Sequence, residues 1–239
     1  MRGVSLFIPV FNEERIMEAN LNRLAGFMEN LDRPFELIVG SNGSFDQTEP
    51  LGRALAARNP RVIFFHLPSK GPGAAFREGL KRASFDLVLT QDMDLSVDLE
   101  FIPRALELLE SHDLVIGSKK MGAQSRSWVR ITGSGLFILF ARALLGLDFQ
   151  DYSLAAKGFR KDLILQNLGW VGPSTDYILN LTYRAHLENR LIKEVPVFCS
   201  DRRGSRFNLI HEGVTRFARL GQLWLYHKLN RKPPWAEEL

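Results

Sequence analysis

Cysteine is almost absent from this sequence, since Cys199 is the single thiol among 239 residues. One thiol cannot form an intramolecular disulfide, so the chain lacks the framework of a small secreted scaffold. Long apolar runs are also missing: the longest charge-free part of the most apolar region, residues 131–141, has about half the length that spans a bilayer. The N-terminus carries no basic region followed by an apolar core and a cleavage site, so we expect no export.

Other common signatures are missing as well. We find no internal repeat, low-complexity tract or long linker, which favours one domain. The five histidines show no metal-ligand spacing. The segment Lys70-Gly71-Pro72-Gly73 is no P-loop, because the Gly-Lys-Ser/Thr ending is absent, and the glycine fingerprint of dinucleotide-binding enzymes is absent too. A dehydrogenase is therefore not expected.

Charge is unevenly distributed along the chain. The composition is ordinary for a globular protein, with 45% hydrophobic and 24% charged residues and a net charge of +4. Residues 1–201 are close to neutral, whereas residues 202–232 hold eight lysines and arginines against the single acidic residue Glu212. This basic end favours an anionic partner such as a nucleic acid, a phosphorylated ligand or an acidic membrane surface; the alternative is a solvated basic tail.

Apolar runs and helical spacing alternate through the first half of the chain. The expected strands are Val4–Val10, Phe35–Val39, Val62–Leu67, Phe85–Gln91 and Leu114–Gly117, and the expected helices are Glu13–Asn30, Asp46–Arg58, Gly73–Ser84 and Leu99–Ser111. Continuous apolar strands indicate a sheet covered on both faces, and the alternation predicts an α/β fold with a mainly parallel sheet. The second half is less regular, with helices expected over 129–145, 176–186 and 209–229, a strand or loop over 154–159 and a strand over 190–198.

Polar and glycine-rich segments follow four of the expected strands. They are Pro9-Val10-Phe11-Asn12-Glu13-Glu14, Ser41-Asn42-Gly43-Ser44, Ser69-Lys70-Gly71-Pro72-Gly73 and Gln91-Asp92-Met93-Asp94-Leu95-Ser96. Ligands of parallel α/β sheets bind outside the carboxyl ends of the strands, so these segments predict the site. Loops are polar in any case, which explains the glycines and serines but explains two aspartates after an apolar strand less well.

The pair Asp92 and Asp94 is the sharpest feature of the sequence. In extended chain, residues i and i+2 project to the same side, so the two carboxylates repel unless a cation lies between them. Mg²⁺ and Mn²⁺ accept one or two carboxylates together with substrate phosphates and water. The pair therefore favours a metal-bound diphosphate, and the alternative is an aspartate turn in which Asp94 binds local amides.

Six short motifs occur in a fixed order from residue 8 to residue 206. They are Ile8-Pro9-Val10-Phe11-Asn12-Glu13, Lys70-Gly71-Pro72-Gly73-Ala74-Ala75 with Gly79, Asp92-Met93-Asp94-Leu95-Ser96, Ile116-Gly117-Ser118-Lys119, Asp151 with Gly158-Phe159-Arg160, and Arg203-Gly204-Ser205-Arg206. Together they resemble family 2 glycosyltransferases with the GT-A fold, in particular the branch that acts on polyprenyl phosphates. The resemblance implies one Rossmann-like domain over 1–239, with a nucleotide-sugar-binding half (1–118), an acceptor half (119–208) and a basic C-terminal helix and tail (209–239).

The resemblance also implies roles for individual residues. Catalysis is expected from Asp92, Asp94 and Arg203, and Asp92, Asp94 and Ser96 are expected to hold Mg²⁺ or Mn²⁺. Contacts to the nucleotide sugar are expected from Pro9, Phe11, Asn12, Glu13, Ser41, Asn42, Lys70, Met93, Arg203 and Arg206. Contacts to the acceptor are expected from Lys119, Arg130, Ser134 and Asp151.

The implied reaction is an inverting, metal-dependent transfer of a sugar from a nucleotide-diphosphate sugar to a polyprenyl (dolichyl or undecaprenyl) phosphate. The expected location is cytoplasmic, peripheral at the inner face of the membrane, with no nucleic-acid partner. Two alternatives stay open: transfer to a hydroxyl with Asp176 as the base, and a non-catalytic nucleotide-sugar-binding subunit. The family usually has V-D-D-G-S after the second strand, where this chain has Ser41 and Asn42. That loss favours the non-catalytic alternative, whereas the intact Asp92–Asp94 pair argues against it.

Overall fold

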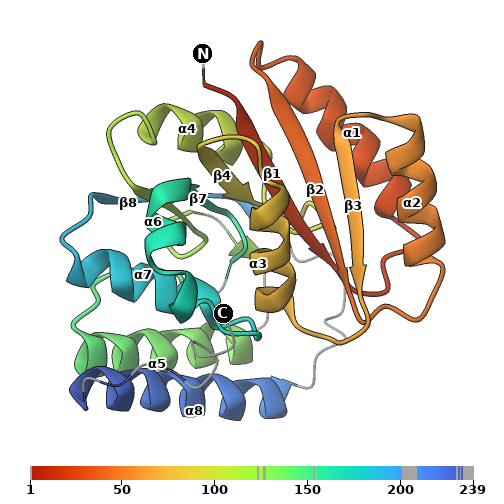
Figure 1. The fold of residues 1–239 in the computed structure, drawn as a ribbon. Helices are drawn as coiled ribbons and strands as arrows, with labels where there is room; N and C mark the ends of the chain where they lie inside the picture. Colours follow the sequence, from red (N-terminus) through yellow and green to blue (C-terminus); the bar gives the residue numbers. More distant parts are fainter. Residues whose placement is uncertain are drawn as a thin grey trace.

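A twisted seven-stranded sheet organises the chain in the computed structural model, which describes residues 2–122, 124–125, 128–152, 154–200, 209–229, 231 and 233 (Figure 1). The strand order is β3-β2-β1-β4-β7-β5-β8. The strands of this sheet are β1 (Val4–Val10), β2 (Phe35–Asn42), β3 (Val62–Leu67), β4 (Leu87–Thr90), β5 (Leu114–Ser118), β7 (Lys157–Arg160) and β8 (Ile192–Pro196). A separate short pair joins β6 (Gln124–Ser125) to β9 (Cys199–Ser200).

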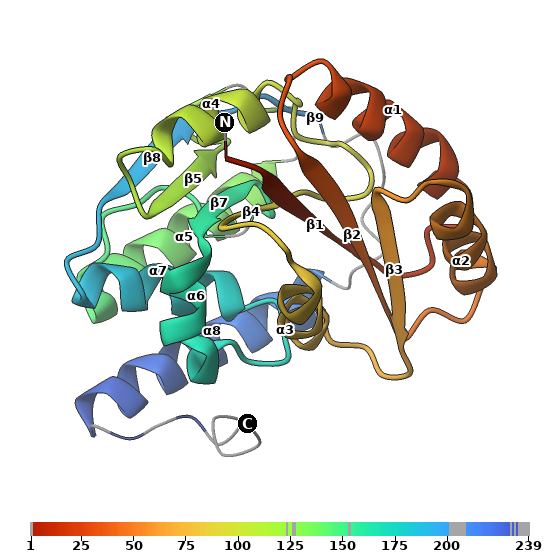
Figure 2. The ribbon, with the colours of Figure 1, turned by 45° about the horizontal axis from the view of Figure 1, so that its top comes forward.

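Helices cover both faces of the sheet, as the continuous apolar strands predict. The helices are α1 (Met17–Glu29), α2 (Thr48–Arg58), α3 (Pro72–Arg82), α4 (Phe101–Leu108), α5 (Trp128–Leu145), α6 (Lys161–Gln166), α7 (Tyr177–Leu187) and α8 (Leu209–Lys228). Side chains alternate between the faces along β1, so Leu6 and Ile8 pack with α1 and α4 while Phe7 packs with α3. Figure 2 shows α1 and α3 on opposite sides of the sheet.

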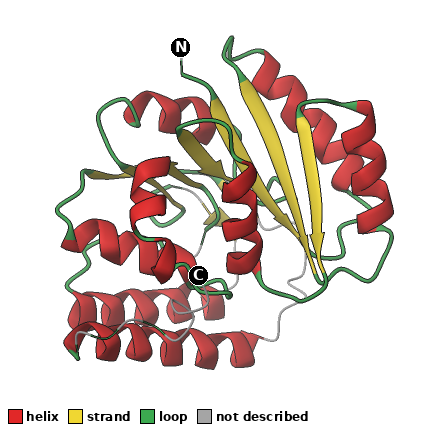
Figure 3. Cartoon of the chain, viewed as in Figure 1, coloured by secondary structure: helices red, strands yellow, loops and turns green. Residues whose placement is uncertain are grey.

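A third apolar cluster lies away from the sheet, between α5, α7 and α8. Its buried members include Ala141 of α5, Leu179 of α7 and Leu223 of α8. Figure 3 shows α5 and α8 lying side by side, and the ring of Phe217 contacts the rings of Phe137 and Phe140. None of the helices in the described ranges combines the length and hydropathy that a bilayer-spanning segment needs.

The mainly parallel α/β sheet is confirmed, but two details differ from expectation. Helix α1 begins at Met17 rather than at residue 13, because residues 13–16 form a turn in which Thr48 accepts a hydrogen bond from the amide of Glu13. Strand β7 runs antiparallel between β4 and β5. As a result, the first residue of β7, Lys157, lies at the carboxyl edge of the parallel strands.

Candidate active site

The strand register brings the predicted loops together at one edge of the sheet. Val10 pairs with Ser41, Asn42 pairs with Leu67, and Thr90 lies opposite Phe7. The loops after β1, β2, β3 and β4 therefore leave from the same edge, as the rule for parallel sheets predicts. Because β7 is reversed, its first residue lies here too: Lys157 pairs with Thr90 on one side and with Ile116 on the other.

The aspartate pair follows β4 on a tight turn. Asp92 is half-buried and Asp94 is exposed. The amide of Leu95 donates to the carbonyl oxygen of Asp92 at 3.1 Å, and Leu95 itself has a positive φ of 50°, a backbone region that costs energy for a bulky residue. Asp94 Oδ1 accepts a hydrogen bond from the amide of Ser96 at 3.0 Å, so the local aspartate turn that the sequence offered as the alternative is present.

The electrostatics of Asp92 are unusual for a carboxylate on a loop. Burial, together with the nearby charge of Asp94, raises its pKa from 3.8 to about 6. The charges of Lys157 and Lys119 oppose this shift. Two carboxylates without a cation between them repel, and this repulsion adds to the larger effect of burial on the pKa of Asp92. Within the described ranges no three His, Cys, Asp or Glu side chains form a cluster that could hold a metal ion.

A buried ionic cluster lies next to the aspartate pair. Lys119 Nζ and Asp151 Oδ2 are 3.0 Å apart, and both side chains are almost completely buried. Lys157 is fully buried as well, and its Nζ donates a hydrogen bond to the carbonyl oxygen of Leu154 at 2.8 Å. Burial lowers the pKa of Lys157 to about 8, against the opposing charge of Asp151. Such charges are tolerated inside a protein only when they are paired, so the cluster fixes this edge of the site.

Two of the four predicted acceptor residues lie next to each other in the structure. Lys119 and Asp151 contact each other, but as a buried pair rather than as an open binding surface. Ser134 is half-buried on α5. The side chain of Arg130, and Arg203 and Arg206 entirely, lie outside the described residues.

The loop after β1 is tied to the loop after β2. Asn12 has a positive φ of 55°, its amide donates to Ser44 Oγ at 3.1 Å, and its Oδ1 accepts the amide of Phe45 at 2.9 Å. Lys70 Nζ lies 4.3 Å from the centre of the Phe11 ring, so these two predicted nucleotide contacts are neighbours. Pro9 is half-buried in β1. The glycine between the loops is required, because Gly43 has a φ of +70° and a Cβ would come within 2.7 Å of the Lys70 amide nitrogen.

Three other predicted nucleotide contacts are used inside the protein. Asn42 donates through Nδ2 to the carbonyl oxygen of Val10 at 2.9 Å and accepts the amide of Gly71 through Oδ1 at 3.2 Å. Ser41 is fully buried, and its hydroxyl lies 3.0 Å from His66 Nδ1. Met93 is buried in the core. Expecting β2 to end at Val39 left Ser41 and Asn42 in a loop, whereas the strand continues through both.

The start of α7 also reaches this edge. The amide of Gly73 at the start of α3 donates to the carbonyl oxygen of Pro173 at 2.9 Å, and a Cβ on Gly73 would come within 1.9 Å of the carbonyl oxygen of Gly172. The N-terminus of α3 is therefore closed by the chain and offers no open anion site. Tyr177 stacks on Phe76 at 4.7 Å, and its pKa is raised by burial and by the charge of Asp92.

Asp176 lies at this junction. It precedes α7 but makes no side-chain cap. Its Oδ2 is 3.4 Å from Asn180 Nδ2, and its Oδ1 is buried without a hydrogen-bond partner in the part of the chain that the structure describes. A cavity beside it is lined by apolar side chains of α5, α7 and the loop between them, and by one cation of α8. The lining residues are Phe137, Tyr152, Thr175, Asp176, Leu179 and Arg216.

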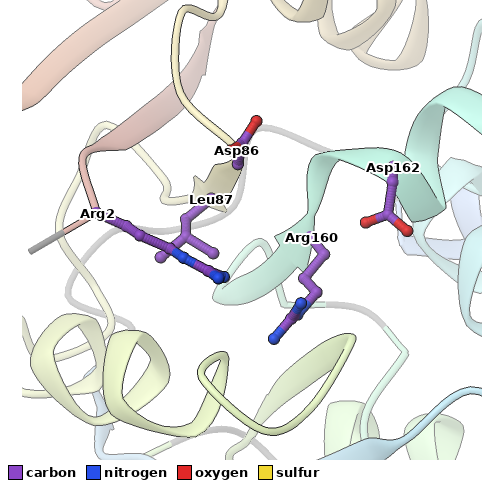
Figure 4. A pocket seen from close by; sticks show the side chains of 5 residues that line it. All are labelled: Arg2, Asp86, Leu87, Arg160 and Asp162. Carbon is purple, nitrogen blue, oxygen red and sulfur yellow. The ribbon is translucent and has the colours of Figure 1, made fainter.

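A larger pocket lies elsewhere and does not belong to this site. Figure 4 shows it at the opposite edge of the sheet, where Arg2 precedes β1 and Asp86 precedes β4. Arg160 lines it too, but its guanidinium donates to the carbonyl oxygens of Leu109, His112 and Glu110. Two arginines and two aspartates balance one another there, so the pocket offers no net charge to a ligand.

Sequence reasoning missed Lys157 and Tyr177. The sequence shows Lys157 only as the residue before Gly158-Phe159-Arg160, and its importance depends on the reversed direction of β7. The available signal was a lysine that follows the apolar residues Leu154, Ala155 and Ala156. Tyr177 looked like an ordinary apolar position of a helix, and its place beside Asp92 arises only from the packing of α7 on α3.

Comparison with known sequences gives one family. Residues 5–166 match the model described as glycosyl transferase family 2. An undecaprenyl-phosphate 4-deoxy-4-formamido-L-arabinose transferase of Aeromonas hydrophila is 33% identical over 164 residues, which cover 67% of this chain and 50% of that protein. The protein of the same name from Serratia proteamaculans is 29% identical over 166 residues, 69% of this chain and 51% of that protein. The chain thus spans about half the length of these curated relatives.

Comparison with solved structures supports the fold over nearly the whole chain. Glucosyl-3-phosphoglycerate synthase from Mycobacterium tuberculosis, solved with Mn²⁺, UDP and glucosyl-3-phosphoglycerate, has a TM-score of 0.66 at 20% identity and covers 98% of this chain and 82% of its own. Residues 1–349 of TarS from S. aureus have a TM-score of 0.63 at 20% identity, with 99% of this chain and 68% of that chain covered. At this identity the likeness concerns the fold alone.

Proposed function

The chain belongs to glycosyl transferase family 2, and from this premise we propose that it transfers a sugar from a nucleotide-diphosphate sugar to a polyprenyl phosphate with inversion. The observation that carries the proposal is the position of Asp92 and Asp94 on the turn after β4, at the edge where the strand loops converge. Relatives that are about 30% identical to this chain over about two thirds of its length are named as undecaprenyl-phosphate transferases, which supports the acceptor class.

Asp92 and Asp94 fit a hard divalent cation. Both offer carboxylate oxygens, and the repulsion that raises the pKa of Asp92 is one that a cation between them relieves. Mg²⁺ or Mn²⁺ bound there supplies positive charge to the departing nucleoside diphosphate. Asp92 and Asp94 are held on the turn at Leu95. The buried lysines Lys119 and Lys157 favour the ionised form of Asp92.

An apolar and basic surface on α5 and α8 supports peripheral contact with an anionic membrane. On α5, the exposed side chains Leu136, Leu139 and Phe140 share one face, because positions i, i+3 and i+4 are neighbours on a helix. On α8, the exposed side chains Val214, Leu225 and Lys228 likewise share one face of the helix. The members of this α5–α8 surface are Leu136, Leu139, Phe140, Val214, Leu225 and Lys228.

Sedimentation with lipid vesicles tests the membrane contact. We expect binding to vesicles that contain anionic lipid and release at high salt, because each basic residue near an anionic leaflet contributes about 1 kcal/mol. Leu139→Asp should weaken binding, whereas Leu165→Asp on α6, also an exposed leucine, should not. Equal binding to neutral vesicles, unaffected by salt, would contradict the electrostatic part.

A transfer assay tests the reaction itself. The protein is incubated with undecaprenyl phosphate in detergent, a panel of nucleotide sugars and Mn²⁺ or Mg²⁺, and lipid-linked sugar is measured. We expect product that disappears in EDTA, and a loss of about 100-fold or more for Asp92→Asn and for Asp94→Asn, since each removes a charged metal ligand. Asp162→Asn, at the opposite edge, should retain activity. Undiminished turnover in chelator overturns metal dependence, and donor binding without transfer to any acceptor indicates a non-catalytic subunit.

A hydroxyl acceptor is the second candidate, and Asp176 is the observation that favours it. A hydroxyl needs a general base, and Asp176 supports this role because its Oδ1 is buried at the edge of a cavity and has no hydrogen-bond partner among the described residues. A phosphate acceptor is mostly dianionic near neutrality and needs no base. Asp176→Asn should therefore keep turnover within about tenfold for a lipid phosphate, whereas a fall of about 1,000-fold in folded protein that still binds donor marks base catalysis.

A further inference from the structure

The turn after β4 carries the two aspartates, and hydrogen bonds from elsewhere in the chain hold its carbonyl oxygens. The amide of Ser200 in β9 donates to the carbonyl oxygen of Ser96 at 2.8 Å. Gln91 Nε2 donates to the carbonyl oxygen of Val97 at 3.1 Å. Both bonds fix the end of the turn, and neither reaches the residue that lies between the two aspartates.

A bond from helix α1 does reach that residue. Asn20 Nδ2 donates to the carbonyl oxygen of Met93 at 2.9 Å, although the two residues are 73 positions apart in the chain. The side chain of Met93 is buried in the same apolar cluster as Met17 and Leu21, which are also residues of α1. Met93 is therefore fixed both through its side chain and through its carbonyl group.

The carbonyl group of Met93 determines how the two carboxylates lie relative to each other. It belongs to the planar peptide unit that joins Met93 to Asp94, so a rotation of this unit changes ψ of Met93 and φ of Asp94. The turn is under strain in the absence of a cation, because Leu95 has a positive φ of 50° and because the carboxylates of Asp92 and Asp94 repel. A bond to this carbonyl oxygen opposes a rotation that would separate the two carboxylates.

Helix propensity does not explain an asparagine at position 20. Asparagine is a poorer helix former than alanine or leucine, because its amide competes for backbone hydrogen bonds. Asn20 is half-buried within α1, and its side chain is directed to the aspartate turn.

We propose that Asn20 is a positioning residue of the metal site, whose hydrogen bond to the Met93 carbonyl oxygen holds Asp92 and Asp94 in the arrangement that Mg²⁺ or Mn²⁺ binds. The inference rests on the proposed function and adds to its metal site a residue outside the aspartate turn. The neutral amide of Asn20 brings no charge, so it acts on the geometry of the carboxylates and not on their attraction for the cation. Groups that orient metal ligands contribute about 10-fold to 100-fold to metal affinity.

Equilibrium binding of Mn²⁺ without nucleotide tests this role. Mn²⁺ is titrated into wild-type protein, Asn20→Ala, Asn22→Ala and Asp92→Asn, and free Mn²⁺ is measured by its electron paramagnetic resonance signal. Asn22→Ala is the matched control, because Asn22 is exposed on the same helix and the substitution brings the same gain in helix propensity. Asp92→Asn identifies the Mn²⁺ that binds at the aspartate turn, since this variant should lose it. Thermal unfolding of each variant in EDTA reports the stability of the metal-free fold.

We expect Asn20→Ala to bind Mn²⁺ about tenfold more weakly than the wild type, and Asn22→Ala to bind it like the wild type. In EDTA, the Tm of Asn20→Ala should lie within about 4 °C of that of Asn22→Ala, because one hydrogen bond contributes little to the stability of a domain of this length.

Equal Mn²⁺ affinity in Asn20→Ala and Asn22→Ala overturns the inference. A failure of Asn20→Ala to fold also overturns it, because the bond then serves the fold and not the metal. If the wild type binds no Mn²⁺ at the aspartate turn, the metal dependence of the proposed function fails together with the inference. If the wild type and Asn20→Ala bind Mn²⁺ equally and Asp92→Asn does not bind it, the inference alone fails.

Discussion

Replacing Asp92 with asparagine should make the metal-free protein more stable at pH 8, although we expect it to impair the proposed transfer reaction. The pKa of Asp92 is raised from 3.8 to about 6, first by burial and then by the charge of Asp94. A shift of one pKa unit corresponds to about 1.4 kcal/mol, so the ionised carboxylate costs up to about 3 kcal/mol in the folded state. Because Asp92 is only half-buried and solvent screens part of this cost, we expect a gain of about 1–2 kcal/mol for Asp92→Asn.

The direction of the pKa shift determines at which pH Asp92→Asn increases stability. The folded-state pKa lies above the unfolded one, so the folded state binds the proton more tightly. Below about pH 4 the carboxyl is neutral in both states and costs nothing; the penalty grows as the pH rises from 4 to 6 and is complete above that window. The advantage of Asp92→Asn should therefore be largest at pH 8 and should shrink as the pH falls through 6 toward 4.

Thermal unfolding in EDTA measures the effect. For a domain of this length, a gain of 1–2 kcal/mol corresponds to a rise in Tm of about 3–8 °C at pH 8. Asp94→Asn is the matched comparison: it removes the like charge but leaves the burial of Asp92, so its gain should be smaller. Added Mn²⁺ should stabilise the wild type and not Asp92→Asn, which reverses their order. A lower Tm for Asp92→Asn in EDTA at pH 8 would refute the reasoning.

Two further substitutions test how the site is supported. Lys157→Met should weaken Mn²⁺ binding near neutral pH, because it removes a charge that opposes the raised pKa of Asp92, and that pKa then rises further. Gly73→Ala should lower stability and activity together, since its Cβ would come within 1.9 Å of a backbone oxygen, whereas Gly26→Ala on an exposed face of α1, with nothing near its Cβ, should stabilise by about 0.5–1 kcal/mol.

Much of the fold could be read from the sequence because burial on both faces leaves a simple pattern. Apolar runs such as Val4–Val10 located the parallel strands, and the rule for their carboxyl ends located Asp92 and its neighbouring loops. The direction of β7 could not be read this way. Four residues, Lys157–Arg160, carry no periodicity that separates a parallel from an antiparallel neighbour, and pairing partners far apart in the chain decide the direction.

The candidate site residues also differ in how well the sequence alone predicted their surroundings. Asp92 and Asp94 were predicted as metal ligands because they follow an apolar strand at the edge where ligands of parallel sheets bind, and the structure confirms their position at that edge. Ser41 and Asn42 were assigned to ligand contact on residue type, but hydrogen bonds to His66 and Val10 direct them inward. A polar side chain at a strand end satisfies either a ligand or the backbone around it, and only the positions of neighbouring strands decide which.

Arg216 distinguishes a lipid phosphate acceptor from a hydroxyl acceptor, because only the phosphate carries a negative charge that an arginine can bind. A lipid phosphate brings negative charge toward an edge that already holds Asp92 and Asp94, so it needs a cation of its own. Lys119 and Lys157 are buried, whereas Arg216 is half-buried and lines the cavity beside Asp176, so Arg216 is our candidate for this contact.

For a phosphate acceptor, Arg216→Gln should raise the KM for the lipid about tenfold or more, the effect of losing one charge-assisted hydrogen bond, and should leave the KM for the donor unchanged. Arg219→Gln is the matched control, because Arg219 lies on the same helix and bonds to Gln222. A hydroxyl acceptor carries no charge for Arg216 to meet, so its KM should not move. If Arg216→Gln instead raises the KM for the donor, Arg216 contacts the donor and not the acceptor. The substitution would then not distinguish a phosphate acceptor from a hydroxyl acceptor.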